Sequence, residues 1–209
     1  MNLILASGSP RRRELLSMFR VEFTVQPSDV DEEAAVEKAR PNHPEEIVML
    51  LAEVKARAVA RDISDPALVL GADTIVWLDD HALNKPRDED DAVAMLMALS
   101  GRTHRVYTGI ALVATGECIL RPGATAFEMT EVEFHPMSES DARAYVATGE
   151  PMDKAGAYGI QDTSIGKKLV KAVRGDYYNV VGLPMDVLRQ RLLPHYPNLP
   201  NTPNPPTFA

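Results

Sequence analysis

Three consecutive arginines follow a turn of small residues near the start of the chain, and together they could bind a phosphate. Residues 3–6 are apolar and predict a buried strand, Ser7-Gly8-Ser9 predicts a tight turn, and Pro10 fits the first position of a helix, where its missing N–H would be unpaired anyway. Ser9 is a suitable N-cap for that helix. Residues 11–13, all arginine, then stand at the positive end of the helix dipole, which is unfavourable unless an anion binds there. Free backbone N–H groups and guanidinium forks suit phosphate; the alternative is that the arginines only point into water.

A carboxylate that could bind a metal or accept a proton follows a second apolar run. Residues 67–71 predict a short strand, and Asp73 comes directly after it in Gly71-Ala72-Asp73-Thr74. Open α/β sheets place their ligands at the C-terminal ends of the strands. An aspartate at such a place can bind Mg²⁺ or activate a water molecule. The alternative is an aspartate that only shapes a turn.

Three further charged residues are candidates with weaker support. Lys85 lies in a loop directly before a proline, which would position it to reach a phosphate. Lys55 lies on a helix that the apolar spacing predicts over residues 45–61. Glu32 lies in the acidic stretch 28–46 and could ligate a metal. For each of the three, an ordinary solvated side chain is the alternative interpretation.

A glycine-rich segment over residues 149–161 has neither the helical nor the strand period. Its glycines would let the backbone approach a ligand closely. Gln161, at its end, carries an amide that both donates and accepts hydrogen bonds, so it could pair with the edge of a base. The alternative is a plain surface loop.

Composition and missing motifs exclude several classes of protein. A net charge of -8 argues against a general binder of nucleic-acid backbones. The single cysteine, Cys118, can form neither an internal disulfide nor a metal cluster. The sequence contains no HExxH, Gly-x-Ser-x-Gly, Walker or Gly-x-Gly-x-x-Gly motif. No signal peptide is evident, and no stretch approaches the ~18 apolar residues of a membrane helix. We therefore expect a cytoplasmic protein with no nucleic-acid or membrane partner.

The remaining pattern predicts an α/β protein with a long, curved sheet. The acidic stretch 28–46 is expected to be a loop that could include a short helical piece. Residues 194–209 hold six prolines and no apolar period, so we expect a disordered tail. The other expected strands are residues 21–25, 74–78, 104–114 and 119–134, with a strand pair at 169–173 and 177–181. The other expected helices are residues 88–99, 138–147 and 184–193.

Taken together, these segments resemble the Maf family of nucleoside triphosphate pyrophosphatases. The match covers residues 2–193 and runs in order through the following segments: Leu5-Ala-Ser-Gly-Ser-Pro-Arg-Arg12, Gly71-Ala-Asp-Thr74, Lys85-Pro86, Leu99-Ser-Gly-Arg-Thr-His104, Asp153-Lys-Ala-Gly-Ala-Tyr-Gly-Ile-Gln161 and Val181-Gly-Leu-Pro184. The resemblance implies a Maf/ITPase-like fold, with an elongated, curved mixed sheet flanked by helices and two lobes around a cleft. It implies one such domain over residues 1–193, followed by the tail at 194–209. It also implies a homodimer.

Three positions place the chain in one branch of that family. The branch that acts on dTTP and UTP carries arginine after Ser-Pro, threonine after the catalytic aspartate and glutamine at the end of the glycine-rich loop. Here these are Arg11, Thr74 and Gln161. The branch that acts on 7-methyl-GTP carries tryptophan, glutamine and glutamate instead, so a methylated-purine enzyme is disfavoured. One departure stands next to the loop, where Asp162 replaces a glycine that the family often has.

The resemblance also implies roles for the other candidates. The nucleoside triphosphate would lie over the turn that contains Ser7, and Arg12, Lys55 and Lys85 would neutralise its charge. Glu32 and Asp73 would hold a divalent cation, Mg²⁺, Mn²⁺ or Co²⁺, and Asp73 would activate the water. The expected reaction converts dTTP or UTP, or a modified pyrimidine nucleotide, to the monophosphate and pyrophosphate. A nucleotide-binding regulator of cell division without significant turnover is the alternative.

Overall fold

The computed structural model describes residues 2–116, 125–162 and 166–206. The chain forms two compact units. The first comprises Met1–Asp73, Thr108–Glu128 and Gly182–Pro205, and the second Thr74–Tyr107, Met129–Val181 and Pro206–Ala209. The boundary between the units falls within the Asp73-Thr74 peptide that the sequence singles out. None of the helices within the described residues is long and apolar enough to cross a membrane.

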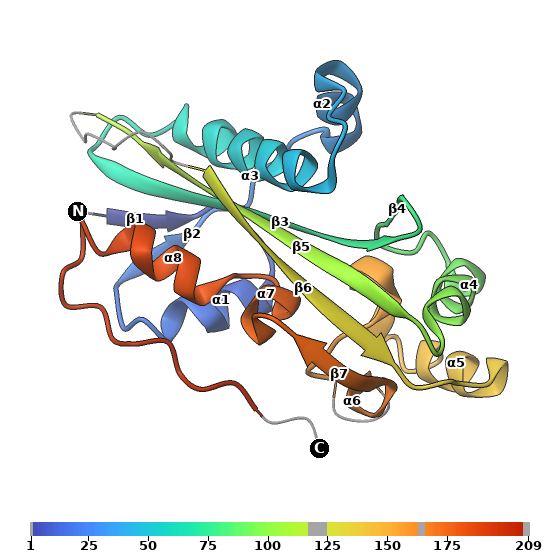
Figure 1. The fold of residues 1–209 in the computed structure, drawn as a ribbon. Coiled ribbons are helices and arrows are strands. Elements are labelled where there is room, and N and C mark those ends of the chain that lie inside the picture. Colours follow the sequence, from blue (N-terminus) through green and yellow to red (C-terminus); the bar gives the residue numbers. More distant parts are fainter. Residues whose placement is uncertain (1, 117–124, 163–165, 207–209) are drawn as a thin grey trace. The chain divides into compact units, whose positions relative to one another are not determined.

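The strands form a seven-stranded sheet in the order β2-β1-β3-β5-β6-β7, with β4 paired to β3 (Figure 1). β1 pairs in parallel with β2 and β3, whereas β4 and β7 pair antiparallel with β3 and β6. The expected mixed sheet is therefore confirmed. The strands are β1 (Asn2–Leu5), β2 (Phe23–Val25), β3 (Ala67–Leu78), β4 (His81–Leu83), β5 (Thr103–Ala114), β6 (Thr125–Phe134) and β7 (Val170–Arg174).

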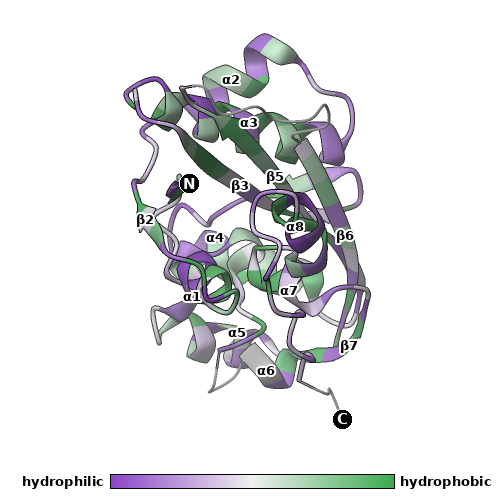
Figure 2. Cartoon of the chain, turned by 90° about the vertical axis from the view of Figure 1, so that its left-hand side faces the viewer, coloured by the Kyte–Doolittle hydropathy of each residue, from purple (hydrophilic) through white to green (hydrophobic). Residues whose placement is uncertain are grey.

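β3 is long because its sequence is apolar almost throughout. Its burial pattern shows ten buried residues among twelve, and Figure 2 shows the corresponding hydrophobic colour along much of its length. Buried strands of this kind read as nearly continuous apolar runs rather than as alternating ones. The strand expected over residues 67–71 and the extended structure expected from Thr74 form one strand, so Asp73 lies inside it rather than after its end.

In the first unit the helix α3 lies directly against the sheet. The helices of this unit are α1 (Pro10–Ser17), α2 (Glu32–Ala39), α3 (Pro44–Ala60) and α8 (Met185–Leu192). A Cβ atom on Gly71 would overlap the carbonyl oxygen of Ala52, and one on Gly109 would overlap that of Val48. Both glycines thus let the α3 backbone approach β3 and β5 more closely than any side chain would allow. Because this packing fixes the position of α3, it also fixes where the side chains of that helix reach.

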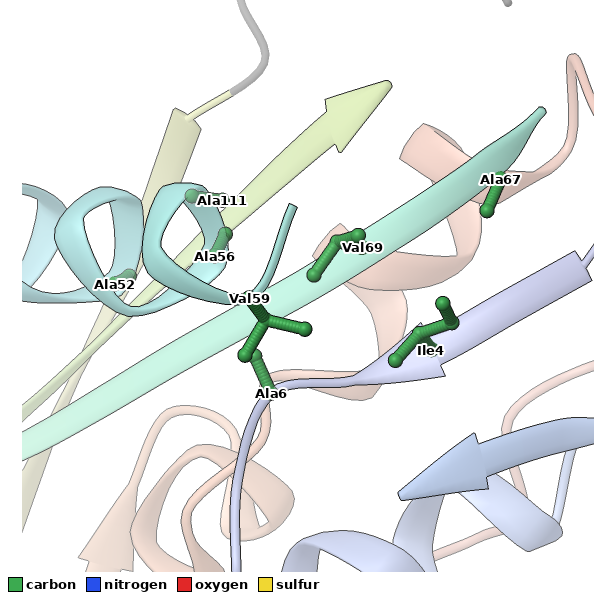
Figure 3. Packing of buried hydrophobic residues seen from close by; sticks show 8 residues of the cluster. All are labelled: Ile4, Ala6, Ala52, Ala56, Val59, Ala67, Val69 and Ala111. Atoms are coloured by element: carbon green, nitrogen blue, oxygen red, sulfur yellow. The ribbon is translucent and has the colours of Figure 1, made fainter. Parts of the chain in front are cut away.

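Small residues fill the space between α3 and the strands. Figure 3 shows the cluster, to which α3 contributes Ala52, Ala56 and Val59. The strands and the segment after β1 supply the other members, which are Ile4, Ala6, Ala67, Val69 and Ala111. All eight side chains are less than a tenth exposed. Alanine-rich packing of this kind follows from the close approach of the helix, since larger side chains would leave no room for it.

In the second unit two helix starts follow their capping signals. Asp88 accepts a hydrogen bond from the N–H of Asp91, and Ser138 and Asp141 form a capping box at the start of the helix expected over residues 138–147. The helices of this unit are α4 (Glu89–Leu99), α5 (Glu139–Val146), α6 (Gly166–Leu169) and α7 (Tyr177–Val181), with 3₁₀ turns η1 (Glu150–Asp153) and η2 (Ala155–Ala157). Local capping chemistry was therefore a reliable guide to helix starts here.

One expectation about the elements was wrong, and another is made more definite. The expected strand at residues 177–181 is the helix α7, whose first turn begins where the Asp176 carboxylate accepts a hydrogen bond from the N–H of Tyr178 at 2.7 Å. Asn179, buried on α7, donates to the carbonyl of Val106 at 3.0 Å. The acidic stretch contains a full helix, α2, capped by Asp31. The expected strand start at residues 119–124 lies outside the described residues.

The described part of the proline-rich tail contacts α8. Leu199 is 7% exposed. Arg189 Nε on α8 donates a hydrogen bond to the carbonyl of Pro200 at 2.8 Å. The N–H of Tyr196 donates to the carbonyl of Leu192 at 2.9 Å. These contacts argue against a free tail as far as Pro200, and truncation can test the expectation of disorder.

We predict that removing residues 194–209 lowers the melting temperature by several degrees. The deletion exposes surface that Leu199 covers, and burial of one leucine stabilises a protein by about 1.5–3 kcal/mol. For a chain of this size, each kcal/mol corresponds to about 2–4 °C. A chain that ends after Pro203 keeps Leu199 and Pro200 and is the matched control. Equal melting temperatures for the two truncations and the full chain would show that the tail is disordered after all.

His104 is a buried histidine in the second unit. It is 2% exposed, its Nε2 lies 2.8 Å from the Tyr158 hydroxyl, and its ring packs edge-on against Phe134 and Tyr158. Burial lowers the pKa of His104 to about 3. In the unfolded chain, a histidine titrates near pH 6.5. As the pH falls below 6.5, the unfolded state therefore binds a proton that the folded state does not, and stability is lost progressively down to about pH 3.

We predict that His104→Gln removes part of this acid sensitivity. Glutamine can still pair with Tyr158 but does not titrate. Between pH 7.5 and pH 5, the parent should lose about 2 kcal/mol more of its free energy of unfolding than the variant does. Urea denaturation at both pH values measures the difference. Equal losses in the two proteins would contradict the assignment of a buried neutral His104.

Candidate active site

The turn after β1 and the start of α1 are built as the sequence predicts. Ser9 caps α1 by accepting from the N–H of Arg12, and Pro10 occupies the first turn. Ser7 is 8% exposed, and its Oγ accepts from the N–H of Ser9 at 3.3 Å. The backbone N–H groups at this end of α1 and the helix dipole together favour an anion.

The Arg12 side chain is held in place by two groups of the same unit. Its Nε donates to the carbonyl of Gly182 at 2.9 Å, and its Nη1 donates to Ser7 Oγ at 3.2 Å. Burial lowers the pKa of the Arg12 guanidinium, and the nearby Asp73 carboxylate opposes that effect. An arginine keeps its charge even so. Arg11 is half-buried, and its charge also lowers the pKa of Arg12.

Asp73 lies within β3 but beyond the C-terminal end of the neighbouring strand β1. Leu5, the last residue of β1, pairs with Leu70, three residues before Asp73. The sequence argument for a ligand site at a strand end therefore applies to β1 and not to β3 itself. Asp73 is 7% exposed, and its Oδ1 accepts a hydrogen bond from Lys55 Nζ at 2.5 Å.

Lys55 joins two carboxylates that are far apart in the sequence. It reaches from α3 and is 9% exposed. Its Nζ lies 2.5 Å from Asp73 Oδ1 and 2.8 Å from Oε1 of Glu32, which begins α2. Burial raises the pKa of Asp73, while the charges of Lys55 and Arg12 oppose the rise. A buried carboxylate with a raised pKa, held by a positioned lysine, can act as a general base.

The carboxylates suit a magnesium-like cation only if a ligand supplies further oxygen atoms. Within the described ranges, no three His, Cys, Asp or Glu side chains form a group that could hold a metal by themselves. Mg²⁺ is usually held by one or two carboxylates together with substrate phosphates. Glu32 and Asp73 converge on a single ammonium, so they supply two such carboxylates close together. Lys55 and Arg12 supply as many positive charges as these two carboxylates supply negative ones, so a cation held here would add net positive charge for an anionic ligand.

Three sequence-predicted residues belong to the second unit, namely Thr74, Lys85 and Gln161. Lys85 and Gln161 are exposed, and Thr74 is half-buried on β3. The Gln161 side chain forms a hydrogen bond with the hydroxyl of Tyr177 on α7. The structure thus brings Ser7, Arg12, Glu32, Lys55 and Asp73 together within the first unit.

Two partners of these residues were not singled out from the sequence. The carbonyl of Gly182 accepts from Arg12, and the Tyr177 hydroxyl pairs with Gln161. Gly182 lies in the last of the segments that carry the family resemblance, which could have pointed to it. Tyr177 was assigned to a strand that does not exist, so no local signal indicated its role.

Comparisons with known proteins extend over most of the chain. A family model described as Maf-like protein matches residues 2–194. A protein of Bacillus cereus strain B4264 named dTTP/UTP pyrophosphatase is 47% identical over 190 residues, which cover 91% of this chain and 93% of the relative. One with the same name from Clostridium botulinum strain Alaska E43 is 45% identical over 192 residues, with coverage of 92% and 98%. The solved structure of the Staphylococcus aureus Ham1 protein aligns with 93% of this chain and 100% of its own at 13% identity and a TM-score of 0.49.

Proposed function

The chain belongs to the Maf-like protein family, and from this we propose that it hydrolyses dTTP and UTP to the monophosphate and pyrophosphate. The observation that carries the proposal is the buried Asp73 carboxylate, which accepts a hydrogen bond from Lys55 Nζ at 2.5 Å. The same unit contains Arg12 and the turn at Ser7, whose backbone N–H groups could bind phosphate. That cluster combines a base with groups that bind phosphate. The two relatives described above, each named dTTP/UTP pyrophosphatase, support the choice of substrate.

In the proposed reaction, a water oxygen attacks the α-phosphorus while Asp73 accepts a proton from that water molecule. A new P–O bond forms there, the bond between the α-phosphorus and the bridging oxygen breaks, and pyrophosphate leaves. Arg12 and the N–H groups around Ser7 bind phosphate oxygens, and Lys55 holds the carboxylate in place. Lys85 is proposed to neutralise part of the negative charge of the triphosphate. A divalent cation, held by Glu32 and Asp73 when bound, would supply electrostatic stabilisation of the leaving group.

Substrate choice is proposed to rest on Arg11, Thr74 and Gln161. The Gln161 amide can donate to a carbonyl of uracil or thymine and accept from N3–H. Its hydrogen bond with the Tyr177 hydroxyl helps to hold the amide in position. We also propose that the protein acts in the cytoplasm, as the sequence led us to expect, and as a homodimer, which the family resemblance alone supports. Modified pyrimidine nucleotides are further candidate substrates.

The experiment is a panel of UTP, dTTP, CTP, GTP and 7-methyl-GTP with Mg²⁺, Mn²⁺ or Co²⁺, followed by separation of the products. We expect pyrophosphate and the monophosphate from UTP and dTTP, with no release of single phosphates. Chelation of the metal should stop the reaction. Nucleotide binding without turnover under all these conditions would instead support the regulator that the sequence left as the alternative.

A further inference from the structure

The turn that carries Gln161 is held by a buried tyrosine of α5. Tyr145 is 0% exposed. Its hydroxyl accepts a hydrogen bond from the N–H of Gly159 at 3.0 Å and donates one to the carboxylate of Asp162. Burial raises the pKa of Tyr145, and the bond to Asp162 adds to the rise, so the hydroxyl keeps its proton. One side chain thus binds the residues on both sides of Ile160-Gln161.

Asp162 also connects the end of the loop to its beginning. Its Oδ1 lies 3.5 Å from Nζ of Lys154, which is 9% exposed. The same ammonium lies 3.0 Å from Asp153 Oδ1 and donates to the carbonyl of Glu150. Lysines are rarely buried unless paired, so the Asp162 carboxylate contributes to holding Lys154 inside the loop.

The Asp162 side chain fills the inside of the turn. The N–H of Asp162 donates to the carbonyl of Gly159 at 3.1 Å, which closes the turn over residues 159–162. A Cβ atom on Gly159 would overlap the Asp162 carboxylate, and its three nearest neighbours are all atoms of that group. Glycine at 159 and aspartate at 162 therefore depend on one another sterically.

The earlier part of the loop has anchors of its own. The N–H of Gly156 donates to the carbonyl of Asn84 at 3.1 Å, and the Tyr158 hydroxyl lies 2.8 Å from His104 Nε2. These contacts fix the chain up to Tyr158. The direction in which residue 161 leaves the turn then depends on the contacts of Tyr145 and Asp162.

We propose that Tyr145, Asp162 and Lys154 are positioning residues that set the geometry of the turn over residues 159–162 and thereby direct the Gln161 amide at a pyrimidine base. This inference rests on the proposed function. An amide held in one orientation pairs with the donor and acceptor edge of uracil, whereas the reversed amide would fit cytosine. A looser turn should therefore lower the preference for uracil over cytosine.

The test measures kcat and KM for UTP and CTP in the full chain and in Tyr145→Phe, Asp162→Ala and Asp162→Asn. Tyr145→Phe removes the hydrogen bonds to Gly159 and Asp162, and Asp162→Ala removes the bond to Tyr145 and the ion pair with Lys154. The ratio of kcat/KM for UTP over CTP should therefore fall about tenfold in each variant. The change should appear mainly in KM for UTP. Asp162→Asn keeps an acceptor for Tyr145 but loses the ion pair with Lys154, so its loss of preference should be smaller than that of Asp162→Ala. Asp186→Ala, an exposed aspartate on α8, is the control and should match the parent.

A double-mutant cycle gives an independent readout. Gly159→Ala alone should displace the Asp162 carboxylate and lower the UTP preference as Asp162→Ala does. On the Asp162→Ala background, the same substitution should add little, because the group it collides with is gone. Additive losses would show that Gly159 and Asp162 act separately, which overturns the inference.

The outcomes separate this inference from the proposed function. A parent protein that hydrolyses UTP and CTP equally well overturns the assignment of base recognition and this inference with it. A parent that prefers UTP, together with a folded Tyr145→Phe variant that keeps the full preference, overturns only the positioning role. Faster amide hydrogen exchange at residues 159–161 in Tyr145→Phe, with a lowered UTP preference, supports it.

Discussion

Asp73→Asn is expected to abolish measurable turnover of UTP while nucleotide affinity stays within about tenfold of the parent. Asparagine keeps the shape of the side chain but cannot accept a proton, and general base catalysis is typically worth about 10²–10⁴-fold in rate. The hydrogen bonds of Arg12 to Ser7 Oγ and to the Gly182 carbonyl hold these phosphate-binding groups in place, and the substitution removes neither of them. Steady-state rates and equilibrium binding of UTP in the presence of Ca²⁺ measure the two quantities.

A matched control for this variant is Asp79→Asn. Asp79 is exposed and pairs with Arg102 at the surface, so the same chemical change there should leave the rate unchanged. Thermal unfolding of both variants shows whether a lost rate reflects lost structure. If Asp73→Asn hydrolyses UTP at nearly the rate of the parent, Asp73 is not the general base.

Gln161→Glu is expected to lower kcat/KM for UTP and dTTP by roughly 10- to 100-fold or more, with a much smaller effect on the affinity for pyrophosphate. A carboxylate can only accept hydrogen bonds, so one carbonyl of the base would face a negative charge without a donor. An unpaired buried polar group costs ~1–3 kcal/mol, and more when a charge is involved. The loss of kcat/KM reports the corresponding loss of transition-state binding. Kinetics with UTP and dTTP and competition by pyrophosphate check both parts.

The control for this substitution is Gln190→Glu, an exposed glutamine on α8 that introduces the same charge. It should leave kcat/KM for UTP unchanged. Gain of activity on 7-methyl-GTP is not expected in Gln161→Glu, because Arg11 and Thr74 are still of the pyrimidine type. UTP hydrolysis by Gln161→Glu at the rate of the parent would show that Gln161 does not recognise the base.

The two predictions depend on different levels of structure. The environment of Asp73 comes from packing, since close contact between α3 and β3 at Gly71 brings Lys55 to the carboxylate. Gln161 is exposed and lies in a turn whose shape depends on Tyr145 and Asp162. Loss of the Asp73 carboxylate should therefore lower the rate of hydrolysis, and loss of the Gln161 amide should change which base is preferred.

The sequence by itself determined the features that depend on neighbours along the chain. The cap at Ser9 with Pro10, a helix over residues 138–147 and the helix α3 were all predicted, because capping and apolar periodicity act over a few residues. The motifs that place the chain in its family could likewise be read directly, and the family model confirms that assignment.

Only the tertiary structure decided which of these residues meet and which groups are buried. Lys55 lies between Glu32 and Asp73, Tyr177 lies on a helix where the sequence suggested a strand, and Asp162 fills a turn where it looked like a departure from the family. These arrangements involve partners distant in sequence, such as Asp73 for Lys55, Val106 for Asn179 on α7 and Tyr145 for Asp162. A local pattern does not contain that information, because burial and long-range pairing override local preference when the chain folds.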